Sequence, residues 1–481
     1  MAALPRPRKR RPERRARPDP RARPVGNARA VTGEAAPVAV IGAGFSGTLV
    51  ALQLARHLPP HRPILLCERS GAFGPGLAYT SGHPDHLLNV RAANMSPFPE
   101  APSHFQDWLD RQPAGEAGQR HLAAPGSFAS RALYGRYLGE LLEAEVAACP
   151  GRLQRIHAQV TCLRPAEGGF ALDFADGSTR FATACVLAIG NLPAAGTCTP
   201  LVRYDPWATT TTTGLRPDIP VLIIGTGLTM IDLAVEIFAR GVPGPVVALS
   251  RHGLLPHAHA PAPACPPIAF SDTERRSALA LLTRLRAEVA AQDGNWRGVV
   301  DAIRPMTQTL WQDMPLPERT RFLRHLRTFW DIHRHRMAPS VAAMVESMRQ
   351  SGFLQVLRGR VLDIAEDGEL AEVSWQPRRA ATSRSLIVQR VIVATGVEKA
   401  VRTSDRLLRG LLDLGVARLD VLGMGLDVTA ELRLLNARGR PVDGLWALGP
   451  IVRGVFWECT AVPDIRAQAV QVARAVAETL E

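Results

Sequence analysis

The sequence lacks the features that mark membrane proteins, metal-binding proteins and dithiol enzymes. Its 481 residues contain no apolar run of about 18 residues, so we expect no membrane-spanning helix and no membrane partner. The seven cysteines form no Cys-x-x-Cys pair and no spacing typical of metal ligands, which argues against a metal site and a dithiol relay. We interpret them as small buried side chains in a reducing cytoplasm.

Acidic residues are scarce at the amino terminus, and this accounts for most of the net charge of +13. Residues 1–35 hold eleven basic and three acidic side chains, which leaves only +5 for the rest of the chain. Because residues 1–36 are rich in Arg and Pro and poor in large apolar side chains, we expect a disordered basic tail. A tail that contacts nucleic acid or an anionic membrane is the alternative. We do not expect nucleic acid to bind the body of the chain.

A repeated local pattern is present. Residues 38–57 and 221–240 each run from an apolar strand through a glycine-rich turn into a helix. An unbroken apolar strand before such a turn is typical of a strand buried on both faces of a parallel sheet. The expected fold class is therefore α/β, with two Rossmann-like dinucleotide-binding domains.

The first turn has the glycine spacing of a dinucleotide-binding turn. Gly42 permits the tight turn, Gly44 lets the backbone approach a pyrophosphate, and Gly47 allows close packing of helix on strand. Glu68 ends the next strand, where its carboxylate can accept both hydroxyls of an adenosine ribose and repel a 2′-phosphate. The alternative is a glycine-rich turn that binds no ligand.

The chain from residue 37 onward resembles a bacterial family described as FAD/NAD(P)-binding proteins. The segments that carry the resemblance are 74–79, 86–90, 105–109, 131–138, 296–297, 304–305, 321–325, 330–336, 457–458 and 461–469. In layout this family is similar to class B flavin monooxygenases. The resemblance implies FAD in the first site and a nicotinamide domain inserted into the FAD domain, but it implies no particular substrate.

With that insertion, we expect the FAD-binding domain to comprise residues 37–200 and 398–481. The NADPH-binding domain is expected to comprise residues 217–397, with a helical insertion at 271–350, where the apolar spacing becomes helical. We assign the following residues to the FAD site: Gly42, Ala43, Gly44, Phe45, Ser46, Gly47, Glu68, Arg69, Leu88, Asn89, Gly190 and Gly449.

The second turn lacks the third glycine, because Met230 stands in its place. That glycine serves helix packing, so its loss leaves nucleotide binding possible. The next strand ends at Ser250 and Arg251 with no carboxylate, and these two side chains can hold a 2′-phosphate. We therefore expect NADPH rather than NADH; a domain that has lost nucleotide binding is the alternative. The assigned residues are Gly225, Thr226, Gly227, Leu228, Ser250, Arg251 and Gly396.

The carboxyl-terminal part departs from related flavoproteins. Gly449-Pro450 stands where a Gly-Asp pair usually holds the ribityl chain. We expect the helix that begins near Pro463 to direct its positive amino terminus at the flavin instead. The alternative is that Asp464 or Thr460 caps this helix.

Residues 324–336 contain a cluster of basic and aromatic side chains. Trp330, Arg334, Arg336 and Arg324 either line an anion-binding pocket or pack helices together with solvated guanidinium groups. His333 and His335 lie two residues apart on an expected helix, so they point to different faces and share no metal.

These observations predict an FAD-dependent, NADPH-oxidising oxidoreductase, monooxygenase-like, that acts on a small-molecule substrate. The FxGxxxHxxxW-type fingerprint of N-hydroxylating and Baeyer–Villiger flavoenzymes is absent. Two alternatives stay open: an NADPH-dependent reductase that does not use oxygen, and a non-catalytic flavin-binding sensor or interaction protein. The sequence identifies no catalytic residue, substrate or oligomeric state.

Overall fold

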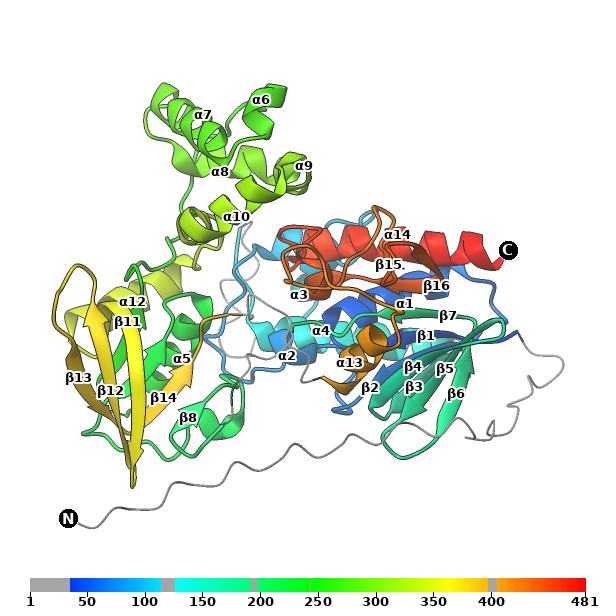
Figure 1. Cartoon of the computed structure of the whole chain (residues 1–481), viewed down its shortest axis with the longest axis horizontal. Coiled ribbons are helices and arrows are strands. Elements are labelled where there is room, and N and C mark those ends of the chain that lie inside the picture. The colour runs from blue at the N-terminus through cyan, green and yellow to red at the C-terminus, as the bar shows by residue number, and fades with distance from the viewer. Residues whose placement is uncertain (1–34, 114–125, 192–195, 197, 243, 397–404) are drawn as a thin grey trace, which may run out of the picture. The chain divides into compact units, whose positions relative to one another are not determined.

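The computed structural model of the chain describes residues 35–113, 126–191, 196, 198–242, 244–396 and 405–481 (Figure 1). The tail expected at residues 1–36 lies almost wholly outside these described residues. No helix in the described part of the chain is long and apolar enough to cross a bilayer.

The first sheet has six strands in the order β15-β16-β7-β1-β2-β3. Its strands are β1 (Val38–Ile41), β2 (Ile64–Glu68), β3 (Leu153–His157), β7 (Ala184–Leu187), β15 (Arg433–Leu435) and β16 (Pro441–Ala447). Every pair is parallel except β15 with β16. Since β16 pairs with β7, the last part of the chain rejoins the sheet that the first part opens.

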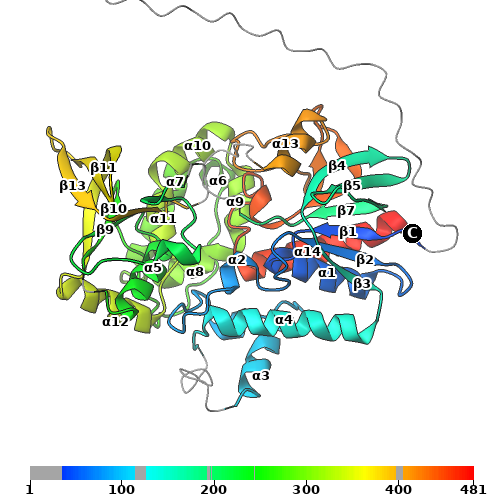
Figure 2. The same ribbon diagram turned by 90° about the horizontal axis from the view of Figure 1, so that it is seen from below.

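Helices share an apolar core with the first sheet. They are α1 (Phe45–His57), α2 (Gly76–Tyr79), α3 (His104–Asp110), α4 (Arg131–Ala148), α13 (Arg406–Asp413) and α14 (Val462–Leu480). Helix α14 lies beside α1 (Figure 1), and α4 runs along α1 as well (Figure 2). Strands β1 and β7 are buried along their whole length, as their unbroken apolar sequences predict. A small antiparallel sheet, β4 (Val160–Ala166), β5 (Gly169–Phe174) and β6 (Thr179–Ala182), contacts β7 through β5.

The second sheet has seven strands in the order β13-β12-β11-β10-β9-β14-β8. Its strands are β8 (Val202–Arg203), β9 (Val221–Ile224), β10 (Val246–Ser250), β11 (Leu354–Asp367), β12 (Leu370–Pro377), β13 (Arg384–Val388) and β14 (Arg390–Val393). Strands β8, β14, β9, β10 and β11 are parallel, and β12 and β13 continue the sheet as an antiparallel pair. Helix α5 (Leu228–Ala239) packs with α12 (Pro339–Gln350) in a shared apolar core.

A helical segment stands between β10 and β11. Besides α12 it contains α6 (Asp272–Arg275), α7 (Ala278–Ala291), α8 (Trp296–Ile303), α9 (Thr307–Asp313), α10 (Leu316–His325) and α11 (Arg327–Arg334). Its apolar core includes Trp311, which stacks on Trp457 with ring centroids 4.8 Å apart. The Trp311 indole N–H also donates to the carbonyl of Gly454 at 2.9 Å. This aromatic contact holds the helical segment against the chain that precedes α14.

The predicted fold class is confirmed. In each of two separate, mainly parallel sheets, one strand leads through a glycine turn into a helix. The limits 37–200, 217–397 and 398–481 stay our proposed division of the chain into domains.

Candidate functional site

The first glycine turn joins β1 to α1 and leaves little room for side chains. Gly42 has a φ of +97°, and an added Cβ would lie 2.6 Å from the carbonyl oxygen of Ala188. A Cβ on Gly47 would lie 1.7 Å from the carbonyl oxygen of Gly42. Gly44 begins α1 without a side-chain cap. The turn therefore offers free backbone N–H groups to an anion, as a dinucleotide pyrophosphate requires.

Glu68 lies beside this turn at the end of β2. One carboxylate oxygen accepts the N–H of Ala43 at 2.9 Å, and the other accepts the N–H and hydroxyl of Ser70 at 2.9 and 2.8 Å. A carboxylate has about four acceptor positions, so one remains for a ribose hydroxyl. We expected Glu68 to accept both ribose hydroxyls, but in this arrangement its carboxylate has room for only one of them. The side chain of Arg69 is exposed next to it.

The turn after β16 lies against the first glycine turn. Gly449 has a φ of +76°, and an added Cβ would lie 2.7 Å from the Ser46 hydroxyl oxygen. Its N–H donates to the side-chain carbonyl of Gln468 on α14 at 2.8 Å. Gly190, with a φ of +70°, follows β7, and an added Cβ would meet nothing within 4 Å. The turns that follow β1, β7 and β16 are far apart in the sequence, and they border one surface next to the first glycine turn.

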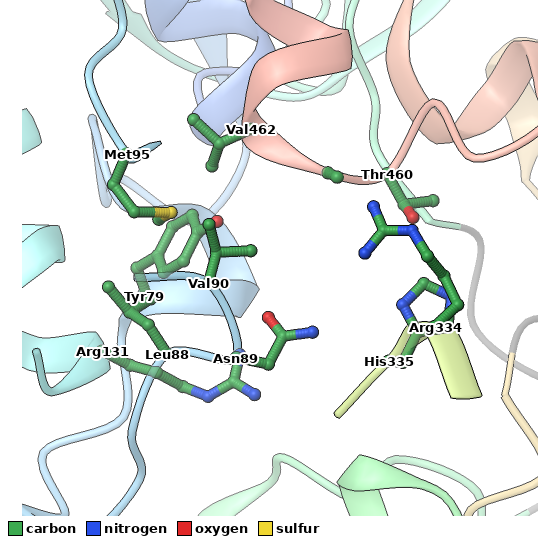
Figure 3. Close-up of a pocket in the computed structure, with 11 residues that line it drawn as sticks. Tyr79, Leu88, Asn89, Val90, Met95, Arg131, Arg334, His335, Thr460 and Val462 are labelled. Carbon is green, nitrogen blue, oxygen red and sulfur yellow. The ribbon is translucent and has the colours of Figure 1, made fainter. Parts of the chain in front are cut away.

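A pocket of about 470 Å³, partly open to solvent, lies next to this surface (Figure 3). Its lining residues are Tyr79, Leu88, Asn89, Val90, Met95, Arg131, Arg334, His335, Thr460, Ala461 and Val462. Tyr79 connects the pocket to the glycine turn, because its ring contacts that of Phe45 with centroids 5.6 Å apart. Of the residues assigned to the FAD site, Leu88 and Asn89 line the pocket itself.

A buried ion pair forms one wall of the pocket. Arg334, at the end of α11, donates from Nε to a carboxylate oxygen of Glu458 at 2.9 Å, and the Trp330 indole N–H donates to the other oxygen. The Arg334 side chain is 11% exposed and that of Glu458 4%. Arg334 thus belongs to the pocket, whereas Arg336 pairs with Asp301 and Arg324 is exposed. The expected cluster is therefore divided, with only part of it in the pocket.

Helix α14 begins at the same pocket, where Thr460 lies near the Arg334 guanidinium (Figure 3). Its amino-terminal cap position is Ala461, which provides no side-chain cap. The idea that Asp464 or Thr460 caps the helix is wrong, because Asp464 instead accepts from Arg304 at 3.3 Å and Thr460 lines the pocket. Burial raises the pKa of Asp464 and lowers that of His335. The pocket lining therefore includes an uncapped helix start and a histidine that favours its neutral form.

The second glycine turn joins β9 to α5. Gly225 has a φ of +128°, and an added Cβ would lie 2.2 Å from the carbonyl oxygen of Ala394. Gly227 begins α5 without a side-chain cap, and a Cβ there would meet nothing within 4 Å. Met230 is fully buried, which agrees with a packing role for the third position. The half-buried Leu228 opens α5, and Gly396 follows β14 with a φ of +79°.

Basic side chains gather at the end of β10. Arg251 is exposed, and the Ser250 hydroxyl is engaged in the turn, where it accepts the N–H of Gly253 and the hydroxyl of Thr226, each at 3.0 Å. Burial, then the charges of Arg378, Arg251 and Arg358, lower the pKa of His252. Sequence reasoning missed Arg358 and Arg378, because Arg358 lies within the long strand β11, where its pairing with β10 ends, and Arg378 follows a strand that is not parallel to β10.

Arg131 connects the pocket to the second glycine turn. It lines the pocket, and its guanidinium donates to the Asp232 carboxylate on α5 at 2.9 Å. His86, also from the first domain, lies 2.9 Å from the Asp232 carbonyl oxygen. Arg131 therefore connects the pocket to α5, the helix that follows the second glycine turn.

No cysteine lines the pocket. All seven cysteines are free, and within the described residues no cluster of three or more metal-binding side chains exists. Cys459 precedes Thr460, but its thiol is buried and donates to the carbonyl of Gly449 at 3.0 Å. Burial raises its pKa, so it stays protonated and unreactive.

Comparison with known proteins agrees with this architecture. Residues 39–192 match the model of a family described as FAD-NAD(P)-binding. No curated protein sequence shows significant similarity to the chain.

Solved structures with the same fold include several flavoenzymes. Ornithine N-hydroxylase from Kutzneria sp. 744 is 15% identical, with a TM-score of 0.64 over 92% of this chain and 99% of that one. L-lysine 6-monooxygenase from Pseudomonas syringae is 15% identical, with a TM-score of 0.63 over 93% and 100%. Thioredoxin reductase from Lactococcus lactis is 12% identical, with a TM-score of 0.52 over 92% and 99%. Residues 39–192 thus match an FAD-NAD(P)-binding family model, in a chain with the fold of two-dinucleotide-binding flavoproteins.

Proposed function

We propose that the chain is an FAD-dependent, NADPH-oxidising oxidoreductase, monooxygenase-like, that acts on a small molecule. One observation carries the proposal. The pocket touches the first glycine turn through Phe45 and Tyr79, and it touches the helix of the second turn through Arg131 and Asp232. When bound, FAD supplies hydride acceptance from a nicotinamide and reactivity toward oxygen or an organic acceptor.

The residues present fit the two nucleotides. Gly44 and Gly227 begin uncapped helices at positions where a pyrophosphate needs close backbone approach. Arg251, Arg358 and Arg378 surround a site that suits a 2′-phosphate, which supports NADPH over NADH. On the first turn the carboxylate of Glu68 disfavours a 2′-phosphate, which supports FAD there.

The solved structures add support for the substrate class. The Kutzneria enzyme was solved with reduced FAD, NADP⁺ and L-ornithine, and a structure from Erwinia amylovora is a cadaverine monooxygenase bound to FAD. Both act on small amines. We extend to this chain only the small-molecule substrate and the two cofactors. A dithiol relay is disfavoured, because Cys459 is buried as a thiol.

The visible spectrum of the purified protein, followed by anaerobic addition of NADPH and readmission of oxygen, tests the proposal. We expect bound FAD that NADPH bleaches and that oxygen restores, with oxygen consumption that exceeds hydrogen peroxide release once a substrate is present. Slow reoxidation that releases only hydrogen peroxide with every amine and acid tried would favour a reductase. Bound flavin that NADPH never reduces would favour a sensor, and a protein that takes up no FAD would overturn the assignment.

A further inference from the structure

The guanidinium of Arg334 has hydrogen-bonding capacity that the described residues do not use. Its Nε donates to Glu458, while Nη2 is buried without a hydrogen-bond partner among the described residues. A buried N–H that lacks a partner destabilises the folded state, so such an atom beside a pocket marks a place for an acceptor. Figure 3 shows the Arg334 guanidinium directed into the pocket near Thr460.

The charges around Arg334 are balanced in pairs. Arg334 pairs with Glu458, Arg304 pairs with Asp464 at 3.3 Å, and burial favours the neutral form of His335. Both carboxylate oxygens of Glu458 are already engaged, one by Trp330 and one by Arg334. Near Arg334 an incoming anion therefore meets a donor without a partner and an acid that is already paired.

The start of α14 adds to the attraction for an anion. Ala461 and Val462 line the same pocket, and the helix has no side-chain cap there. A 19-residue helix directs the positive end of its dipole at this position. The rest of the lining includes Leu88, Val90 and Met95, which suit an apolar body.

We propose that Arg334 and the first turn of α14 form a subsite for the carboxylate of a substrate whose body is small and apolar. The inference rests on the proposed function, because it places this substrate beside the flavin. One guanidinium Nη2 and a helix start match a monoanionic carboxylate better than a phosphate, which takes more donors. The carbonyl edge of a flavin could use the same donors, so the test must separate substrate from flavin.

Benzoate and benzamide are the probes, because they share shape and differ in charge. Binding to the FAD-loaded protein is measured by calorimetry and by the change in the visible flavin spectrum. We expect benzoate to bind at least tenfold more tightly than benzamide and to perturb the flavin spectrum. Equal binding of the two probes, or no binding of benzoate, would overturn the proposal.

A double variant, Arg334→Met with Glu458→Gln, removes both charges of the buried pair and avoids an unpaired carboxylate. We expect it to weaken benzoate about ten- to hundredfold, to leave benzamide unchanged and to retain FAD. Arg334→Lys should recover part of the benzoate affinity if the variant is folded. Arg324→Met, an exposed arginine of the same helical segment, is the matched control and should change nothing.

The outcomes separate this subsite from the flavin site. Loss of FAD from the double variant, with circular dichroism and melting temperature as in wild type, would mean that Arg334 contacts the flavin, and would overturn the substrate assignment. If the wild-type protein takes up no FAD but calorimetry still shows selective benzoate binding that needs Arg334, the anion subsite stands and the proposed function fails.

Discussion

At the scale of single residues, the most specific feature is a group of arginines that meet from different strands. Arg251 follows β10, Arg358 lies on β11 opposite Ser250, and Arg378 follows β12. The Arg378 guanidinium lies 2.7 Å from Nδ1 of His252. The group lies at the carboxyl end of β10, and a doubly wound sheet binds its nucleotide at the carboxyl ends of its parallel strands.

Replacing either Arg251 or Arg378 by Ala should weaken NADPH about ten- to hundredfold, because each removes a charge-assisted hydrogen bond of about 1.5–3 kcal/mol. NADH has no 2′-phosphate, so its affinity should stay within about twofold. Fluorescence titration with both nucleotides measures this. Arg240→Ala, at the opposite end of α5, is the control. Equal losses for NADH and NADPH would show that the arginines support the fold.

His259 provides a residue-scale prediction for stability. Its Nε2 lies 3.1 Å from the Asn89 carbonyl oxygen, and burial lowers its pKa from 6.5 to about 4. Below the unfolded value of 6.5 the unfolded chain takes up a proton that the folded chain refuses. The contribution of His259 is therefore present above pH 6.5 and is lost as the pH falls toward about 4.

We expect His259→Gln to reduce this acid sensitivity, because glutamine can still donate to Asn89 without titrating. Urea unfolding at about pH 7.5 and about pH 4.5 compares wild type with variant, and the wild type should lose more stability between the two values. Other histidines contribute equally to both proteins, so they cancel in the difference. Identical pH dependence in the two proteins would contradict the assigned role.

At the scale of elements, the two glycine turns have the same arrangement but different tolerances. In both, the first glycine is required by a positive φ and by a carbonyl of the neighbouring strand, Ala188 for Gly42 and Ala394 for Gly225. The middle glycine of the second turn is different. Gly227 has a φ of −83°, and its missing side chain faces open space. The packing of the protein therefore does not require a glycine at position 227. A ligand that approaches the backbone there would require it.

Gly227→Ala should therefore weaken nucleotide binding without impairing folding. The melting temperature should stay unchanged or rise slightly, because alanine restricts the unfolded chain by about 0.4–1 kcal/mol and meets no atom in the folded chain. NADPH affinity should fall at least about tenfold, since the new methyl group occupies the space of the pyrophosphate. Thermal melts and NADPH titration measure the two effects. Unchanged affinity would place the nucleotide elsewhere.

Gly225→Ala is the matched comparison at the same turn. Its Cβ would lie 2.2 Å from a backbone oxygen and its φ is +128°, so the variant should be strongly destabilised or fail to fold.

At the scale of the whole chain, one buried pair connects the two sheets. Arg131 begins α4, and Asp232 lies on α5 behind the second glycine turn. Their side chains are 15% and 8% exposed, and they meet at 2.9 Å. Because Arg131 also lines the pocket, this contact relates the two proposed nucleotide sites.

Asp232→Asn should lower the free energy of unfolding by about 1–3 kcal/mol, because a partly buried guanidinium loses its charged acceptor. The control is Glu369→Gln, which alters the exposed pair with Arg216 and should change stability by about 0–1 kcal/mol. Urea unfolding followed by tryptophan fluorescence measures both. An effect no larger than that of the control would mean that the pair does not hold the domains together.

Local features were accessible from the sequence because neighbours in the chain create them. The strands before both glycine turns are buried as their apolar runs predict, and Gly47 is constrained by the carbonyl of Gly42 in its own turn. The family resemblance is confirmed for residues 39–192, which match the model of a family described as FAD-NAD(P)-binding. The two-domain fold is confirmed as well, since it needs only this pattern twice.

Only the tertiary structure decided what surrounds each proposed site. Arg334 and Glu458 are 124 residues apart, and Arg131 and Asp232 are 101 apart. No period of hydrophobicity encodes such partners, because the lengths and packing of the intervening elements determine which guanidinium reaches which carboxylate. For the same reason the sequence left open whether Arg334 binds an anion or packs a helix. The glycine turns depend on backbone conformation over a few residues, whereas the pocket depends on where distant elements meet.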